Sequence, residues 1–212
     1  MKYENIEYVI GIDQSYTRTA YSICHQGKII ACGSIAPKAS NQAYMKRKLI
    51  GRYISKALNK NARIYGFNPD NTIILFERIR MFSRGFLSMN YIVKTGALIA
   101  LMSDMFTELG YECFTVDTRA WKAAVVGTSK PKSNHFGINP AKWPTILYVR
   151  DNKLISGNKY LVEEKRRKKG VLRIDGKYYS VNDDICDAVC ISKFPFSIHK
   201  GEVEELLKAA DF

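Results

Sequence analysis

Four acidic residues stand at points where strands and a helix are predicted to end or begin. Asp13 and Glu77 each follow a short apolar run, and Asp184 and Asp187 are three residues apart in a later segment. Residues three apart on a helix project from the same face. Carboxylates are preferred Mg²⁺ ligands, and two such ions about 4 Å apart can activate water and stabilise a leaving oxygen. The four acids therefore predict a two-metal hydrolytic site.

Each acid also has an ordinary structural explanation. Asp13 alone is typical of a turn after a strand, and Glu77 of a surface position at a strand end. Asp184 and Asp187 alone would fit a helix start stabilised by the helix dipole. The order strand, strand, helix favours the metal site over these separate explanations.

The elements that must position these acids follow from hydrophobic periodicity and turn residues. Residues 8–35 predict a three-stranded meander with a tight turn at Gly27. An amphipathic helix is predicted over 43–58, a buried strand over 72–76 and a second helix over 86–109, closed by Gly110. Strands alternating with helices indicate a mixed sheet covered by helices.

The second half of the chain is predicted with fewer regular elements. A strand over 111–116 leads into a short helix capped by Asp117 or Thr118. Residues 133–182 are expected to be a basic decoration on a single domain spanning 1–212, with a hairpin over 171–181 that turns at residues 175–176. Helices are predicted over 183–194 and about 202–210.

Positive charge is concentrated in two stretches. The formal net charge is +13, from 33 Lys and Arg against 20 Asp and Glu. Residues 118–182 hold 15 basic and 4 acidic residues. Residues 38–63 contain no acidic residue, and their basic residues are Lys38, Lys46, Arg47, Lys48, Arg52, Lys56, Lys60 and Arg63. High charge can serve solubility alone, but acids embedded in basic surroundings favour cations held beside a phosphate backbone.

The composition also argues against secretion and membrane insertion. None of the five cysteines forms a CxxC pair, which favours reduced thiols and the cytoplasm. The start of the chain lacks the apolar stretch of a signal peptide, and the longest apolar segment, 96–106, is interrupted by Asp104 and too short to cross a bilayer.

Four segments resemble the RuvC family of Holliday junction resolvases in order and spacing. They are Val9 to Ser15, Ile74 to Glu77, Trp121 to Gly127 with Lys130 and Lys132 after it, and Asp184 to Cys190. The resemblance implies a ribonuclease H-like, mixed five-stranded sheet with a basic insertion before the last catalytic helix. It also implies two Mg²⁺ or Mn²⁺ ions on Asp13, Glu77, Asp184 and Asp187, in a homodimer that nicks a four-way junction symmetrically.

The same resemblance assigns residues to the DNA. Lys122 and one of Lys130 or Lys132, with Lys132 preferred, are expected at the scissile phosphate, where a fixed cation stabilises developing charge. Phe82, or Phe86 if it is not in the core, is expected to wedge into the junction centre. Further DNA contacts are expected from Arg78, Arg80, Arg84, Arg166 and Arg167. The long insertion indicates a divergent phage-type branch, in the host bacterial cytoplasm.

Two other functions compete. Residues 11–17 also resemble the phosphate loop of actin-like ATPases and sugar kinases, but the second Asp-x-Gly motif and the larger chain of that class are missing. A structure-specific DNA-binding protein without cleavage is the other alternative. The hypothesis we retain is in-line attack of water on the phosphodiester, giving a 5′-phosphate and a 3′-hydroxyl without a covalent intermediate.

Overall fold

A computed structural model describes residues 5–38, 42–79, 89–127, 141–155, 161–164, 171–174 and 177–208. The main sheet has five strands in the order β3-β2-β1-β4-β5. Their bounds are Tyr8–Asp13 for β1, Thr19–His25 for β2, Lys28–Ile35 for β3, Thr72–Glu77 for β4 and Glu112–Val116 for β5. The pairs β1–β2 and β2–β3 are antiparallel, and β1–β4 and β4–β5 are parallel. The predicted mixed five-stranded sheet is confirmed.

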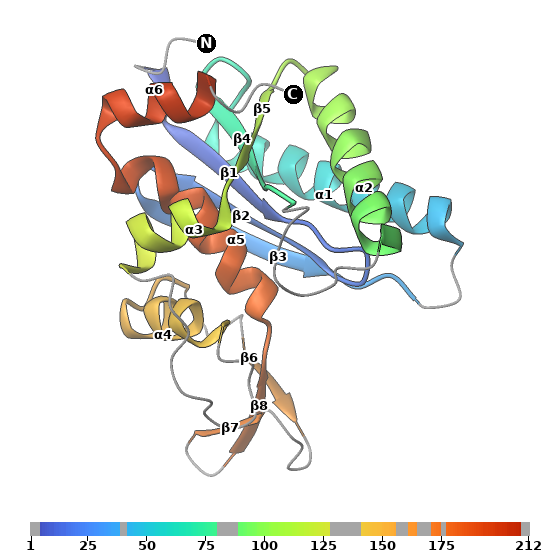
Figure 1. Cartoon of the computed structure of the whole chain (residues 1–212), viewed down its shortest axis with the longest axis vertical. Coiled ribbons are helices and arrows are strands. Elements are labelled where there is room, and N and C mark those ends of the chain that lie inside the picture. The colour runs from blue at the N-terminus through green and yellow to red at the C-terminus, as the bar shows by residue number, and fades with distance from the viewer. Residues whose placement is uncertain are drawn as a thin grey trace.

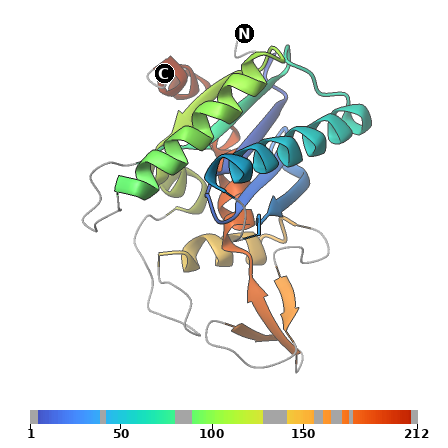
Figure 2. The ribbon, with the colours of Figure 1, turned by 90° about the vertical axis from the view of Figure 1, so that its right-hand side faces the viewer.

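Two long helices cover one face of the sheet. Helix α1 is Ala43–Tyr65 and α2 is Met89–Thr107, and they lie side by side (Figure 2). Their buried residues pack on β-strand residues of one parity, including Ile10, Ile12 and Phe76. Helix α1 runs seven residues beyond the predicted end at residue 58, because the left-handed Gly66 (φ 76°) terminates it.

The opposite face carries the later helices. One core joins the strands to α3 (Thr118–Trp121), the π-helical turn η2 (Lys122–Val126), α4 (Trp143–Asp151) and α5 (Asp183–Lys193) (Figure 1). After α5 come the 3-10 helix η4 (Phe194–Ser197) and helix α6 (Lys200–Lys208). The sequence predicted either Asp117 or Thr118 as the cap of α3. The cap is Asp117, whose side chain accepts hydrogen bonds from Arg119 N and Ala120 N. Alternation along each strand therefore gives the sheet two separate apolar layers.

The basic insertion contains more regular structure than expected. Besides α4, a three-stranded antiparallel sheet has the order β6-β8-β7, with β6 at Leu161–Glu164, β7 at Val171–Ile174 and β8 at Lys177–Val181. The predicted hairpin is the β7–β8 pair, in which Ile174 pairs with Lys177. Helix α4 and strand β6 were not predicted. Figure 1 shows this small sheet leading directly into α5.

No helix in the described ranges is long and apolar enough to cross a membrane. None of the five cysteines, all of which lie in the described ranges, forms a disulfide bond.

Candidate metal centre

The centre begins at the adjacent ends of β1 and β4. Ile12 pairs with Phe76, so Asp13 and Glu77 come next on two neighbouring parallel strands. Side chains alternate along a strand, and Val9 and Leu75 pack into the layer that contains α5. Asp13 and Glu77 share their parity. Both carboxylates therefore stand on the α5 side of the sheet.

Gly11 allows α5 to cross the sheet at this point. A Cβ on Gly11 would stand 2.4 Å from both Ala188 O and Ser192 N of α5, which real Cβ atoms do not tolerate. The helix backbone consequently lies directly against β1, two residues before Asp13. This close approach brings the α5 acids to the strand acids.

Helix α5 presents its acidic first turns to the same place. Asn182 caps the helix by accepting from Ile185 N, and its amide donates to Ser34 Oγ of β3 at 2.8 Å. Asp187 lies one turn further on and is 2% exposed, whereas Asp184 is partly exposed and pairs with Arg18 at 3.8 Å. Two predicted acids therefore reach the sheet edge from one helix.

Gln14 ties the two strand ends together. Its side-chain amide donates to Glu77 O at 2.5 Å and its side-chain oxygen accepts from Glu77 N at 3.1 Å. Gln14 is 4% exposed, so these bonds form away from water. The contact fixes the backbone of Glu77 against the end of β1, and periodicity gave no signal of it.

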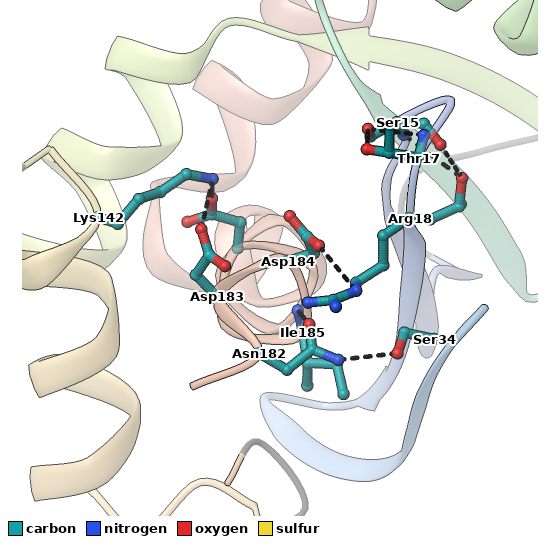
Figure 3. A network of polar contacts seen from close by, with 11 residues as sticks. Ser15, Thr17, Arg18, Ser34, Lys142, Asn182, Asp183, Asp184 and Ile185 are labelled. Atoms are coloured by element: carbon teal, nitrogen blue, oxygen red, sulfur yellow. Dashed lines mark hydrogen bonds and ion pairs between the residues drawn. The ribbon is translucent and has the colours of Figure 1, made fainter. Parts of the chain in front are cut away.

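Lys142, at the start of α4, is the functional residue that the sequence reasoning missed. Its ammonium donates to Asp187 Oδ2 and stands 3.5 Å from Asp183 Oδ2. Figure 3 shows Lys142 and Arg18 approaching the first turn of α5 from opposite sides. Position 142 lay among the 15 basic residues of 118–182, so charge alone could not single it out.

The carboxylates perturb one another. Burial raises the pKa of Asp13 well above its ordinary value, and the charges of Glu77 and Asp187 raise it further. Burial and the Asp187 charge likewise raise the pKa of Glu77, against a hydrogen bond from Thr118. For Lys142, burial lowers the pKa, but the carboxylates of Asp187 and Asp13 outweigh it and the pKa is raised.

The pKa of Asp184 is also raised. Burial and the neighbouring Asp183 charge raise its pKa to about 6, against the attraction of Lys142 and Arg18. The site thus concentrates negative charge in a place with little water. A cation bound there would favour the ionised form of each acid.

The oxygen atoms of the four acids are the type of ligand that a hard divalent ion such as Mg²⁺ prefers. Every donor is a carboxylate oxygen, and Asp187 Oδ1 is buried with no hydrogen-bond partner among the described residues. Such an orphaned oxygen costs about 1–3 kcal/mol until something binds it. Within the described ranges, however, no three acidic, histidine or cysteine side chains are grouped as ligands for one ion. The ammonium of Lys142 contacts both Asp187 and Asp183.

Two other predicted residues lie next to the acids. Lys122 Nζ stands 3.3 Å from Ala141 O and 5.1 Å from the centroid of the Trp121 ring, and its charge acts on Glu77. Arg78 directly follows Glu77, and its Nε donates to Thr115 Oγ1 on β5 at 3.3 Å.

The remaining predicted contacts fall outside the described residues. They are Arg80, Phe82, Arg84, Phe86, Lys130, Lys132, Arg166 and Arg167.

Comparison with known proteins identifies the architecture. No family model matches this chain, and no curated protein matches it. Among solved structures, Thermus thermophilus RuvC in complex with a Holliday junction substrate aligns with a TM-score of 0.56 at 16% identity, covering 88% of this chain and 90% of that chain. The chain has the RuvC fold.

A second RuvC structure from the same organism agrees. It gives a TM-score of 0.53 at 15% identity and covers 88% of this chain and 92% of that chain. The RuvC fold extends over nearly the full length of both proteins, and the predicted ribonuclease H-like fold class is therefore correct. At this low identity the likeness establishes the fold, and function has to be argued from the site.

Proposed function

We propose that this protein is a metal-dependent DNA endonuclease that resolves four-way junctions by paired symmetric nicks. The observation that carries the proposal is the electrostatic coupling of Asp13, Glu77 and Asp187 where α5 crosses the ends of β1 and β4. The RuvC structure of the same fold was solved with a Holliday junction substrate, which supports this choice of DNA.

Asp13, Glu77, Asp184 and Asp187 would hold two Mg²⁺ ions, for which Mn²⁺ could substitute. The ions would supply activation of water and stabilisation of the leaving oxygen. Asp187 Oδ1 offers a buried oxygen ready to coordinate. Gln14 keeps the Glu77 backbone in place, so that the two strand carboxylates stay adjacent.

Two lysines would support the reaction from the α3–α4 side. Lys142 already contacts Asp187 and would turn its ammonium toward the phosphate as charge develops there. Lys122 flanks Glu77 and would assist, as would Lys132. We expect in-line hydrolysis that leaves a 5′-phosphate and a 3′-hydroxyl.

The basic surface would bind the arms of the junction. A net charge of +13 supports a polyanionic partner, and affinity should fall steeply as salt rises. Arg78 lies beside the acids and would contact DNA, together with the predicted residues Arg80, Phe82, Arg84, Lys130, Arg166 and Arg167. From the length of residues 133–182 we further propose a divergent phage-type branch acting in bacterial cytoplasm.

Paired nicks require two sites, and we propose a homodimer. Helix α2 carries an apolar stripe with 73% of Met89 and 60% of Val93 exposed, continued by Gly96 and Ala100 at helical spacing. A second copy covering this stripe would remove apolar surface from water.

The test is nicking of a labelled four-way junction with and without Mg²⁺. Asp13→Asn should bind the junction as the wild type does and nick it at least about 100-fold more slowly, because a carboxylate ligand is lost. Asp104→Asn, which removes an exposed acid from α2, is the matched control and should nick normally. Junction binding with no nicks in Mg²⁺ or Mn²⁺ would instead show a DNA-binding protein without cleavage.

A further inference from the structure

A second cationic group, on the loop that follows Asp13, takes no part in the mechanism above. Tyr16 is in the loop between β1 and β2, three residues after Asp13. Lys46 of α1 lies 5.9 Å from the centroid of the Tyr16 ring, and Lys94 of α2 lies 5.7 Å from it. Both distances are within the range of cation–π attraction. Two helices therefore bring two ammonium groups to one ring.

The loop is built to hold that ring in place. Thr19 Oγ1 donates to Ser15 O at 2.8 Å, and the hydroxyls of Ser15 and Thr17 are 2.9 Å apart. Figure 3 shows Ser15 and Thr17 close together in this turn. The Tyr16 hydroxyl is buried and has no hydrogen-bond partner in the part of the chain that the structure describes. The ring thus contributes its faces to the two lysines.

Within the part of the chain that the structure describes, no acidic side chain balances the charge of either lysine. Neither forms an ion pair with an acidic residue among the described ranges. Two ammonium groups that approach one ring repel each other, and an anion that both flexible side chains can reach would offset that repulsion. A phosphate oxygen accepts hydrogen bonds from both ammonium groups, which makes phosphate the matching ligand.

We propose that Lys46 and Lys94, held by the Tyr16 ring, bind one backbone phosphate of the DNA strand next to the phosphate that is cut. The inference rests on the proposed function, since it places this second phosphate on the same strand. Tyr16 follows Asp13 by three residues, so at most about 11 Å of backbone separates Tyr16 from that acid. The group would set the register of the strand over the site.

The first arm of the test measures junction binding in EDTA, where nicking plays no part. Lys46→Gln and Lys94→Gln should each lower the slope of log affinity against log salt by about 1. Lys28→Gln removes an exposed charge at the far end of the sheet and should leave the slope unchanged. Tyr16→Leu keeps the net charge but should weaken binding as much as the double lysine variant, while Tyr16→Phe should bind normally.

The second arm identifies the phosphate. In a set of junctions, each backbone phosphate near the cut is replaced in turn by a neutral methylphosphonate. The replacement should weaken binding of the wild-type protein at one of these positions. The double variant Lys46→Gln/Lys94→Gln should show no further loss at that position, because the contact is already absent. Thermal unfolding of each variant confirms that it is folded.

The two proposals fail in different ways. If wild-type protein nicks the junction while both lysine variants bind like Lys28→Gln, or Tyr16→Leu binds like the wild type, the phosphate group is wrong and the nuclease stands. If wild-type protein binds with a phosphate-specific loss but never nicks, the proposed function is wrong and the phosphate group stands.

Discussion

Lys142 contacts two acids of α5 at once, Asp187 directly and Asp183 at 3.5 Å. Its charge also acts on Asp13, Glu77 and Asp184. One lysine therefore stabilises the ionised form of most of the carboxylate cluster. In the mechanism that we propose, the same ammonium would stabilise the charge that develops on a phosphate.

We predict that Lys142→Gln slows single-turnover nicking about 100-fold, the cost of losing one preorganised donor to the transition state. Junction binding should weaken far less, because one of many positive charges is lost. Lys153→Gln, at the other end of α4, is the matched control and should nick at the wild-type rate. Equal rates in the two variants would remove Lys142 from the mechanism.

The pH dependence of stability follows from the raised pKa of Asp184. Its folded value of about 6 lies above its ordinary value of 3.8, so the folded chain holds more protons between them. The stability from this group is fully present below 3.8 and is lost as the pH rises through about 6. We predict that, relative to Asp184→Asn, metal-free wild type loses about 2–3 kcal/mol of unfolding free energy from pH 4 to pH 7.

Urea unfolding in EDTA at several pH values measures this difference directly. Mg²⁺ should act in the opposite sense, because it binds the ionised carboxylates and so stabilises more at pH 7.5 than at pH 5.5. If the difference in unfolding free energy between the wild type and Asp184→Asn did not change with pH, the raised pKa of Asp184 would be contradicted.

Helix α5 is the element that joins the two halves of the centre. Three side-chain bonds hold it on the sheet: Asn182 to Ser34 at 2.8 Å, Ser192 to Ser22 at 3.1 Å and Lys193 Nζ to Gly27 O at 2.6 Å. With both ends fixed, the height of the helix above β1 depends on Gly11. The geometry of the acids therefore depends on a residue with no side chain.

We predict that Gly11→Ala lowers the free energy of unfolding by about 1–3 kcal/mol, because its Cβ would press on the backbone of α5. Nicking should fall together with stability, since Asp187 moves with the helix. Gly201→Ala is the matched control, because nothing lies within 4 Å of a Cβ there. Chemical denaturation and junction nicking of both variants check the prediction, and a stable, active Gly11→Ala protein would disprove it.

At the scale of the whole molecule, the homodimer that we propose would bring two sites to one junction through the α2 stripe. We predict that Val93→Glu shifts the protein from dimer to monomer in analytical ultracentrifugation and uncouples the paired nicks, because a charge would be buried in the interface. Ile64→Glu is a close control, since both side chains are 60% exposed. Dissociation by both variants, or by neither, would place the interface elsewhere.

The sequence by itself determined the strands of the main sheet and the class of that sheet, and it singled out the four acids. Alternation and helical spacing report on the surface that each element buries, so β1, β4 and α5 were predicted almost to their observed ends. Helix α1 ended later than predicted, although Gly66 marks its end. The insertion, with its weak periodicity, concealed α4 and β6.

Only the tertiary structure decided which partners surround the acids. Lys142 meets Asp187 across 45 residues of chain, and Gln14 meets Glu77 across 63. Such pairs depend on where whole elements pack, and no local pattern in either segment encodes them. The closeness of Gly11 to α5 is of the same kind, because a glycine is informative once its neighbour in space is known.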